Sequence, residues 1–205
     1  MNERDRVRRR RRLVGAGGAV TLVALGLGLA FSAGGTDTAA ADPITVLAPA
    51  GSPTGQPVDG ISSSEEEQLA FHIHAHLQIY VDGQQRALPP GVGIVPPLQV
   101  QSTSDGPFVI GGSGIYWLHT HDSSGIIHIE SPVQREFTLG EVFDIWGQPL
   151  GPQQVGPAKG PVTALVNGVA VIADPRQIVL NAHDVIQLDV GAVVGFQTYR
   201  FAPGL

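Results

Sequence analysis

The stretch that decides the fold is FHIHAHLQIYVD, at residues 71–82. Apolar and polar residues alternate over all twelve of its positions. Because successive side chains of a β-strand point to opposite faces, this alternation predicts one long strand with an apolar face and a polar face. The Asp82-Gly83 pair that follows predicts a hairpin turn. Consecutive positions on the polar face are occupied by His72, His74 and His76, which we call the first histidine run.

The second histidine run comprises His119, His121 and His128. The turn sequence at residues 122–125, Asp-Ser-Ser-Gly, separates two expected strands over 115–121 and 126–130. A loop of two or four residues would place His119 directly opposite His128, with Cβ atoms ~4.5–5.5 Å apart. A three-residue loop would instead turn His128 to the other face. That other face is apolar and is expected to contact the core through Tyr116, Leu118, Ile127 and Ile129.

The two runs hold six of the seven histidines in the chain, and imidazole is a preferred ligand of transition metals. The chain has no cysteine and its only methionine is Met1, which excludes disulfides, thiolate sites and blue-copper chemistry. We therefore predict a site for a transition metal, copper or zinc, built from nitrogen and oxygen ligands. The candidate ligands are His72, His74, His76, His119, His121 and His128. The remaining histidine, His183, is expected to be an ordinary surface residue.

Strand geometry leaves two arrangements of these ligands open. Alternate residues lie ~6.6–6.8 Å apart along a strand, so His72 and His76 cannot easily share one ion whose nitrogen ligands lie ~2.0–2.1 Å away. In the first arrangement, His74 and His76 join His119 and His121 in a four-nitrogen site. In the second, the three histidines of the second run form a centre with an open position. The first histidine run would then bind a second metal ion or transfer ions to the three-histidine centre.

The second arrangement resembles the zinc site of carbonic anhydrases and, more loosely, the metal site of cupins. Both place a His-x-His pair on one strand and a further histidine on its neighbour. The usual cupin motif has a glutamate three or four residues after His-x-His, whereas here Asp122 follows at once and Glu130 comes nine residues later. The resemblance covers the site alone and implies no family for the chain.

Four residues near the second run have alternative interpretations. Glu130 should share the histidine face opposite Trp117, where we expect a solvent-facing charge; the alternative is a fourth ligand or a partner that orients one. Asp122 is expected to serve the turn rather than a metal. Trp117 and Ile115 either wall a pocket on the histidine face or pack against a neighbouring strand.

The N-terminus has the pattern of an export or membrane segment. Residues 1–32 combine a basic flank, Arg8–Arg12, with an apolar stretch, Leu13–Phe31, about as long as the ~20 residues that span a bilayer. A secretory signal is usually shorter, at ~7–15 apolar residues, although Ala39–Ala41 would suit a signal peptidase. We expect an uncleaved anchor in the cell membrane, with the N-terminus cytoplasmic and the rest outside the cytoplasm. Cleavage would give a secreted protein.

The remaining chain divides by composition. Residues 33–65 are rich in Gly, Pro, Ser and Thr, which predicts a flexible linker, and the acidic run Glu65–Glu67 is expected to be solvated. Residues 66–205 form the predicted domain. From Asp42 onward the chain has five basic and fifteen acidic residues, a net charge of −10 with histidine neutral. Such a surface cannot neutralise a run of phosphates, so we expect no nucleic-acid partner.

The domain is predicted to be mostly β, a single sandwich or open barrel with one short helix. Thr138 and Glu141 form a capping box, apolar residues follow at helical spacing, and Gly147 ends the helix. An Asn167-Gly168 turn predicts a hairpin over 162–172. Further strands are expected at 92–95, 98–101, 108–110 and 184–190.

Two classes of function remain open at this point. The first is a membrane-tethered extracytoplasmic protein that binds copper or zinc. The second is an extracytoplasmic metalloenzyme, since a three-histidine centre with an open position can activate water or bind oxygen. A structural zinc linking two sheets and a pH-sensing cluster are lesser alternatives. The sequence contains no Gly-x-Ser-x-Gly motif and no glycine-rich phosphate loop in a suitable context.

Overall fold

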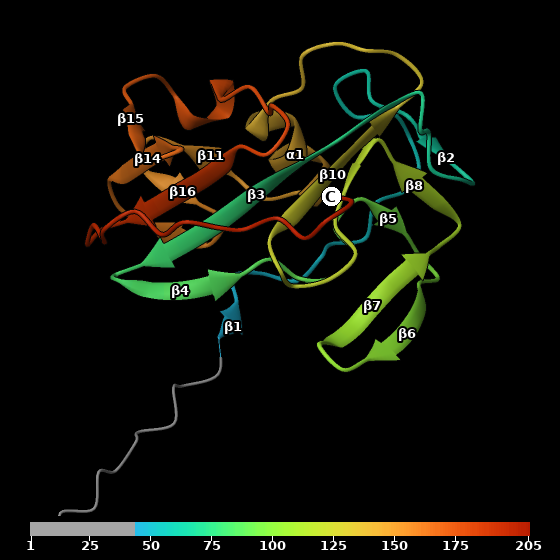
Figure 1. Ribbon diagram of the computed structural model, residues 1–205, viewed down its shortest axis with the longest axis horizontal. Helices are drawn as coiled ribbons and strands as arrows, with labels where there is room; N and C mark the ends of the chain where they lie inside the picture. Colours follow the sequence, from blue (N-terminus) through green and yellow to red (C-terminus); the bar gives the residue numbers. More distant parts are fainter. Residues whose placement is uncertain (1–43) are drawn as a thin grey trace, which may run out of the picture. The chain divides into compact units, whose positions relative to one another are not determined.

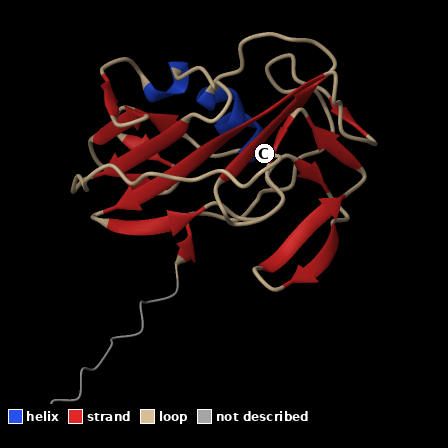
Figure 2. Ribbon diagram, viewed as in Figure 1, coloured by secondary structure: helices blue, strands red, loops and turns tan. Residues whose placement is uncertain are grey.

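The computed structural model describes residues 44–205 (Figures 1 and 2). This part is mostly β, with mixed sheets and one α-helix, in agreement with the sandwich-like domain that the sequence predicts. The predicted membrane segment at residues 1–32 lies outside the described residues. Within residues 44–205, no helix combines the length and the apolar character needed to cross a membrane.

The long predicted strand is the centre of the main sheet. It is β3 (Phe71–Val81), and its first half pairs antiparallel with β10 (Ile126–Ser131). Its second half lies between β4 (Gln84–Ala87), which is antiparallel, and β16 (Val185–Val190), which is parallel. The sheet continues outward from β3 through shorter strands: β1 (Thr45–Val46) on β4, β14 (Val162–Val166) on β16, and β15 (Val169–Val171) on β14. Figure 1 shows β3 running the length of this sheet.

Both predicted two-residue turns are present. Asp82 and Gly83 have φ angles of 50° and 81°, and Asn167 and Gly168 have 51° and 82°. These left-handed conformations at both central positions are those of a type I′ hairpin turn, which fits the twist of the flanking strands. The hairpins β3–β4 and β14–β15 are therefore confirmed.

The predicted register of the second histidine hairpin is also confirmed. In β9 (Leu118–His119), His119 pairs directly with His128 of β10, and Leu118 pairs with Ile129. The opposite faces of both strands contribute to the core, where Tyr116, Leu118, Ile127 and Ile129 are at most 1% exposed.

Three small sheets flank the main one. They are β2 (Ser63–Ser64), β8 (Gly114–Tyr116) and β5 (Ile94–Val95); β6 (Gln99–Thr103) and β7 (Gly106–Gly111); and β11 (Leu150–Gly151), β12 (Gln154–Val155) and β13 (Ala158–Lys159). A 3-10 turn, η1 (Pro175–Gln177), precedes β16.

Helix α1 (Leu139–Trp146) has the predicted boundaries. Thr138 accepts a hydrogen bond from the Glu141 backbone, the Glu141 carboxylate accepts one in return, and Gly147 ends the helix with φ 71°. Its apolar residues join the apolar faces of β3 and β10 in one core. The sheet therefore has a core face covered by α1 and a polar face that carries the histidines.

The composition-based linker at residues 33–65 differs from the structure in its described part. Residues 44–65 pack on the domain: β1 pairs with β4, Ile61 is fully buried, and the Trp146 indole donates to the Pro49 carbonyl. Composition missed this because a few apolar residues, well spaced among prolines and glycines, are enough to fill sites that larger elements leave open. The folded domain therefore begins before residue 66.

Candidate metal centre

Five of the six candidate histidines converge on the polar face of the sheet, at the point where three strands run side by side. The strand register causes this convergence. His128 on β10 pairs with His74 on one side and with His119 on the other, and Glu130 pairs with His72. Directly opposed residues on neighbouring strands project to the same face. We call these five histidines, with Glu130 and Glu67, the histidine cluster.

The first part of the cluster is a closed ring of four donor atoms. His72 Nε2 lies 3.0 Å from His74 Nε2, which lies 3.2 Å from His128 Nδ1. Glu130 Oε1 completes the ring at 3.1 Å from both His128 Nδ1 and His72 Nε2. Nitrogen ligands placed ~2.0–2.1 Å from one ion would be about 2.9 Å apart at right angles and about 3.3 Å apart at tetrahedral angles. The ring therefore has the dimensions of a metal-binding site.

The second part of the cluster is formed by His119 and His121, whose tautomers are fixed by the backbone. His119 Nδ1–H donates to the Tyr116 carbonyl at 2.9 Å, and His121 Nδ1–H donates to the Val109 carbonyl at 2.6 Å. A neutral imidazole has one N–H, so both Nε2 atoms present lone pairs, and they face each other at 3.2 Å. Two opposed lone pairs at this distance favour a cation between them. Outer hydrogen bonds that fix the ring in this way are typical of metal-ligating histidines.

Glu130 is buried, which corrects the expectation of a solvent-facing charge. Its side chain is 2% exposed; it pairs with His72 of β3 on one side, and its backbone N–H donates to the Trp117 carbonyl on the other. Oε1 accepts from His128, whereas Oε2 is buried without a hydrogen-bond partner, 3.9 Å from His119 Nε2. Burial alone would raise the pKa of Glu130, but the His128 hydrogen bond, and the attraction of neighbouring imidazoles once they are protonated, lower it on balance. A buried carboxylate without full pairing is costly, and a metal ion would supply the missing partner.

Glu67 is a member of the cluster that the sequence analysis missed. Its Oε1 lies 3.3 Å from His121 Nε2, although the acidic run Glu65–Glu67 is expected to be solvated. The residue is a little over one-third exposed, so it lies at the rim of the cluster. No sequence signal could have found it, because its position depends on how the loop before β3 folds over residue 121.

The segment that carries His119 and His121 is anchored by the residue between them. Thr120 is fully buried; its backbone N–H donates to the Val92 carbonyl, and its hydroxyl donates to the Pro89 carbonyl. Gly93 permits this close approach, because a Cβ there would lie 2.3 Å from the Leu118 carbonyl oxygen. This pair of histidines is thus held by packing as well as by its own hydrogen bonds.

His76 is the candidate ligand that the structure holds apart. Its Nε2 lies 2.9 Å from the Ser124 carbonyl, to which it donates, and its ring stacks on Tyr199 at 3.6 Å. It belongs to none of the donor groups around His128. The four-nitrogen arrangement that includes His76 is therefore wrong in this geometry. The reason is the ~6.6–6.8 Å spacing along β3, which leaves His76 beyond the end of the cluster.

Burial also lowers the pKa values of several imidazoles in the cluster. It lowers the pKa of His119 to about 3, with smaller effects from nearby His128 and His121. Burial likewise lowers the pKa of His74 to about 4 and that of His121 below its usual value. These imidazoles are neutral at physiological pH and are therefore competent ligands.

Two cavities adjoin the cluster, but neither Trp117 nor Ile115 lines them. A cavity of about 380 Å³ is lined by Glu67, His72, His74, His121, His128 and Glu130, together with Phe108, Ile110 and the C-terminal residues 204–205. A second, of about 340 Å³, shares His121 and His128 and extends to Tyr199. Ile115 packs with Ile94 and Val109, and Trp117 packs on the core, so the packing interpretation holds for both. Asp122 serves its turn, accepting from the Ser124 backbone.

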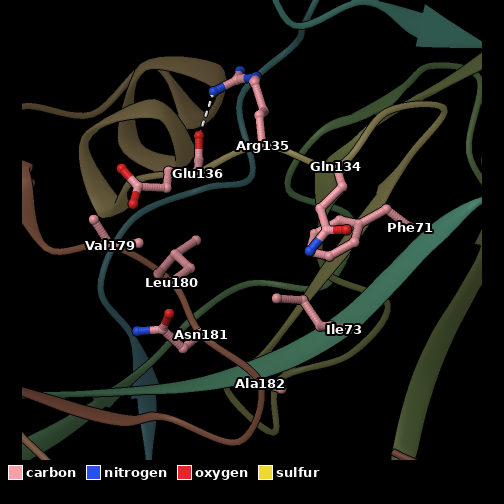
Figure 3. Close-up of a pocket in the computed structure, with 9 residues that line it drawn as sticks. All are labelled: Phe71, Ile73, Gln134, Arg135, Glu136, Val179, Leu180, Asn181 and Ala182. Carbon is pink, nitrogen blue, oxygen red and sulfur yellow. Dashed lines mark hydrogen bonds between the residues drawn. The ribbon is translucent and has the colours of Figure 1, made fainter.

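A separate cavity of about 410 Å³ has no cluster of candidate metal ligands among the described residues that line it (Figure 3). It lies at the start of β3, between Phe71 and the segment 179–182, and no histidine lines it. Arg135 in its lining donates to the Glu136 carbonyl and forms an ion pair with Glu141. His183, expected to be ordinary, donates to the Leu205 carbonyl and lies outside the cluster.

Comparison with known proteins does not assign the chain to a family or a function. No family model, curated protein or solved structure matches the chain. The buried histidine and glutamate groups could hold a metal ion, and their geometry is the basis of the functional argument.

Proposed function

We propose that this protein binds a transition metal, copper or zinc, through the histidine cluster. The observation that carries the proposal is the pair of opposed His119 and His121 Nε2 lone pairs beside the unpartnered Glu130 Oε2. A folded protein that places three uncompensated acceptors together, in the absence of a cation, would be destabilised by the arrangement. Imidazole and carboxylate without thiolate suit copper(II) and zinc equally, so the donor set supports both.

The location of this metal chemistry is part of the proposal. The basic flank and apolar stretch at residues 1–32 support a membrane anchor that leaves the domain outside the cytoplasm. A domain held there would bind the metal before the cell's cytoplasmic buffers could compete. The function that follows is sequestration, delivery or sensing of the metal at the cell surface.

A metalloenzyme is the second candidate, and the cavity beside the cluster favours it. The space of about 380 Å³ lies directly against the ring of donors and has apolar walls at Phe108 and Ile110. A bound metal with an open position supplies a Lewis acid or an activated water. Phe108, stacked on His121 with ring centroids 4.9 Å apart, would hold that imidazole in place and exclude solvent from one side.

Elemental analysis of the untagged full-length chain tests the proposed function. The wild-type protein, purified after exposure to copper or zinc and dialysed, should retain stoichiometric metal. His119→Ala should lose metal, because it removes a fully buried ligand whose tautomer is fixed. Equal metal content in the two proteins would exclude His119, and a metal-free wild type would refute the proposal.

A further inference from the structure

We infer that the histidine cluster binds two metal ions side by side, with the Glu130 carboxylate bridging them. This inference rests on the proposed metal-binding function and specifies its stoichiometry. The first ion would lie in the ring of His72, His74, His128 and Glu130 Oε1. The second would lie among His119, His121, Glu67 and Glu130 Oε2.

The number of donors is the first argument. The cluster contains five imidazoles and two carboxylates, whereas a zinc site in a protein is almost always four-coordinate. A single ion would leave three donors, most of them buried, without a partner. Two ions that share Glu130 give each ion four donors, three nitrogens and one oxygen in the first case and two of each in the second.

The orientation of the Glu130 carboxylate is the second argument. Oε1 is directed at the first group, 3.1 Å from His72 Nε2 and His128 Nδ1. Oε2 is directed at the second group, 3.9 Å from His119 Nε2, and has no hydrogen-bond partner. The two groups adjoin at His128, which also has a donor atom within 4.8 Å of those of His119 and His121. One carboxylate whose two oxygens face two adjoining donor groups is the geometry of a bridging ligand. Bridged ions in two-metal sites lie ~3.5–4 Å apart.

The second group is closely spaced but does not form a single closed ring like the first. His121 Nε2 lies 3.2 Å from His119 Nε2 and 3.3 Å from Glu67 Oε1. Donor atoms of Glu67, His119 and Glu130 all lie within 4.8 Å of one another. The distance from Glu130 Oε2 to His119 Nε2, 3.9 Å, is wider than any contact in the first ring, and Glu67 lies at the exposed rim. We therefore expect the second ion to bind more weakly than the first.

The test is a metal titration of the untagged full-length protein with Zn²⁺, followed by elemental analysis after dialysis. Wild type should bind two ions per chain. His72→Ala, which changes a partly exposed side chain of the first group, and His121→Ala, in the second group, should each bind one. His183→Asn is the matched control, because it removes a histidine outside the cluster and asparagine tolerates the φ of 63° at that position. It should still bind two.

The outcomes separate the two claims. One ion in wild type would overturn the inference and leave the proposed function intact, whereas no ion would refute the proposed function. Loss of all metal from both His72→Ala and His121→Ala, with folding confirmed by circular dichroism, would also indicate a single site. Should His121→Ala fail to fold, Glu67→Gln at the rim provides the second-group test. It should weaken the second binding step at least tenfold and leave the first unchanged; equal affinity for both steps would contradict the assignment.

A spectroscopic measurement tests the bridge itself. Two Cu²⁺ ions held by one carboxylate interact magnetically, so the doubly loaded wild type should lose paramagnetic resonance intensity relative to its copper content or show a half-field signal. Glu130→Gln has nearly the same shape but only one amide oxygen to offer, and it should abolish this coupling. Full resonance intensity from two isolated ions in wild type would rule out the bridge.

Discussion

At the residue scale, two histidines that are only two positions apart on one strand have different surroundings. His74 and His76 share a face of β3, yet His74 lies in the ring opposite His128, whereas His76 stacks on Tyr199. The sequence shows that the three histidines of the first run share a face. It cannot show which of them faces another candidate donor, because that depends on the register with β10, in which His74 pairs with His128 but His76 pairs with Ile126.

The same substitution should therefore lower the metal content at one of these two positions and leave it unchanged at the other. His74→Phe removes a ring nitrogen and should lower the bound metal by at least one ion per chain. His76→Phe should leave metal content unchanged and reduce stability by ~1 kcal/mol, because the Ser124 carbonyl loses its donor. Elemental analysis and urea unfolding of both variants provide the check. Equal metal loss in the two would contradict the position of His76 outside the cluster.

The buried imidazoles also give the metal-free protein a pH-dependent stability. The pKa of His119 is lowered to about 3 by burial and by nearby His128, whereas in the unfolded chain it is ~6.5. The unfolded state alone takes up the proton, so the contribution of His119 is fully present above ~6.5 and is lost as pH falls toward 3. Each pH unit in that window should remove up to about 1.4 kcal/mol for this residue.

Urea unfolding of chelator-treated protein between pH 7.5 and 5 measures this loss. His119→Gln should reduce the slope of stability against pH, because glutamine does not titrate. A free energy of unfolding that stays constant over this range would show that the folded protein takes up as many protons as the unfolded chain, so that burial does not keep these histidines neutral.

At the scale of elements, short-range signals identified α1 and the two hairpins correctly. The capping box, the Asn-Gly and Asp-Gly turns, and the alternation of β3 each depend on residues within a few positions of one another. Strands of two residues, such as β2 and β5, have no such local pattern and form only because β8 lies between them. Their pairing could not be read from the sequence.

The helix cap can be tested directly. Thr138→Ala removes the side chain that accepts from the Glu141 backbone N–H and should lower the free energy of unfolding by ~1 kcal/mol. Thr45→Ala is a suitable control, since this exposed residue lies at the edge of the sheet in β1. A similar effect at both positions would argue against the cap as the cause.

At the scale of the whole molecule, composition misplaced the beginning of the packed chain. Leu47, Ala48 and Ile61 belong to the core, and the Tyr116 hydroxyl donates to the Gln56 carbonyl. The contribution of residues 44–65 can be measured by thermal unfolding of two truncated variants, one that lacks residues 1–43 and one that lacks residues 1–65. The variant that lacks residues 1–65 should unfold at a markedly lower temperature than the other. Equal midpoints for the two truncations would show that residues 44–65 contribute nothing to stability.

The sequence predicted the mostly-β class, the polar face and five of the cluster's members, because these follow from period-two patterns and turn chemistry. It did not predict the burial of Glu130 or the contact of Glu67 with His121. Both depend on long-range placement, since Glu130 lies between β3 and the segment at Trp117, and Glu67 approaches from a preceding loop.

The anchoring of Thr120 has a consequence for the speed at which the proposed metal would exchange. Because its peptide and hydroxyl groups are held by residues 89–92, His119 and His121 cannot rotate apart without disrupting buried hydrogen bonds. The conformational cost of ordering these ligands is thus incurred when the chain folds, before any ion arrives. A preorganised site of this kind should bind and release a metal ion without refolding. Small zinc domains, in contrast, fold only when the metal binds.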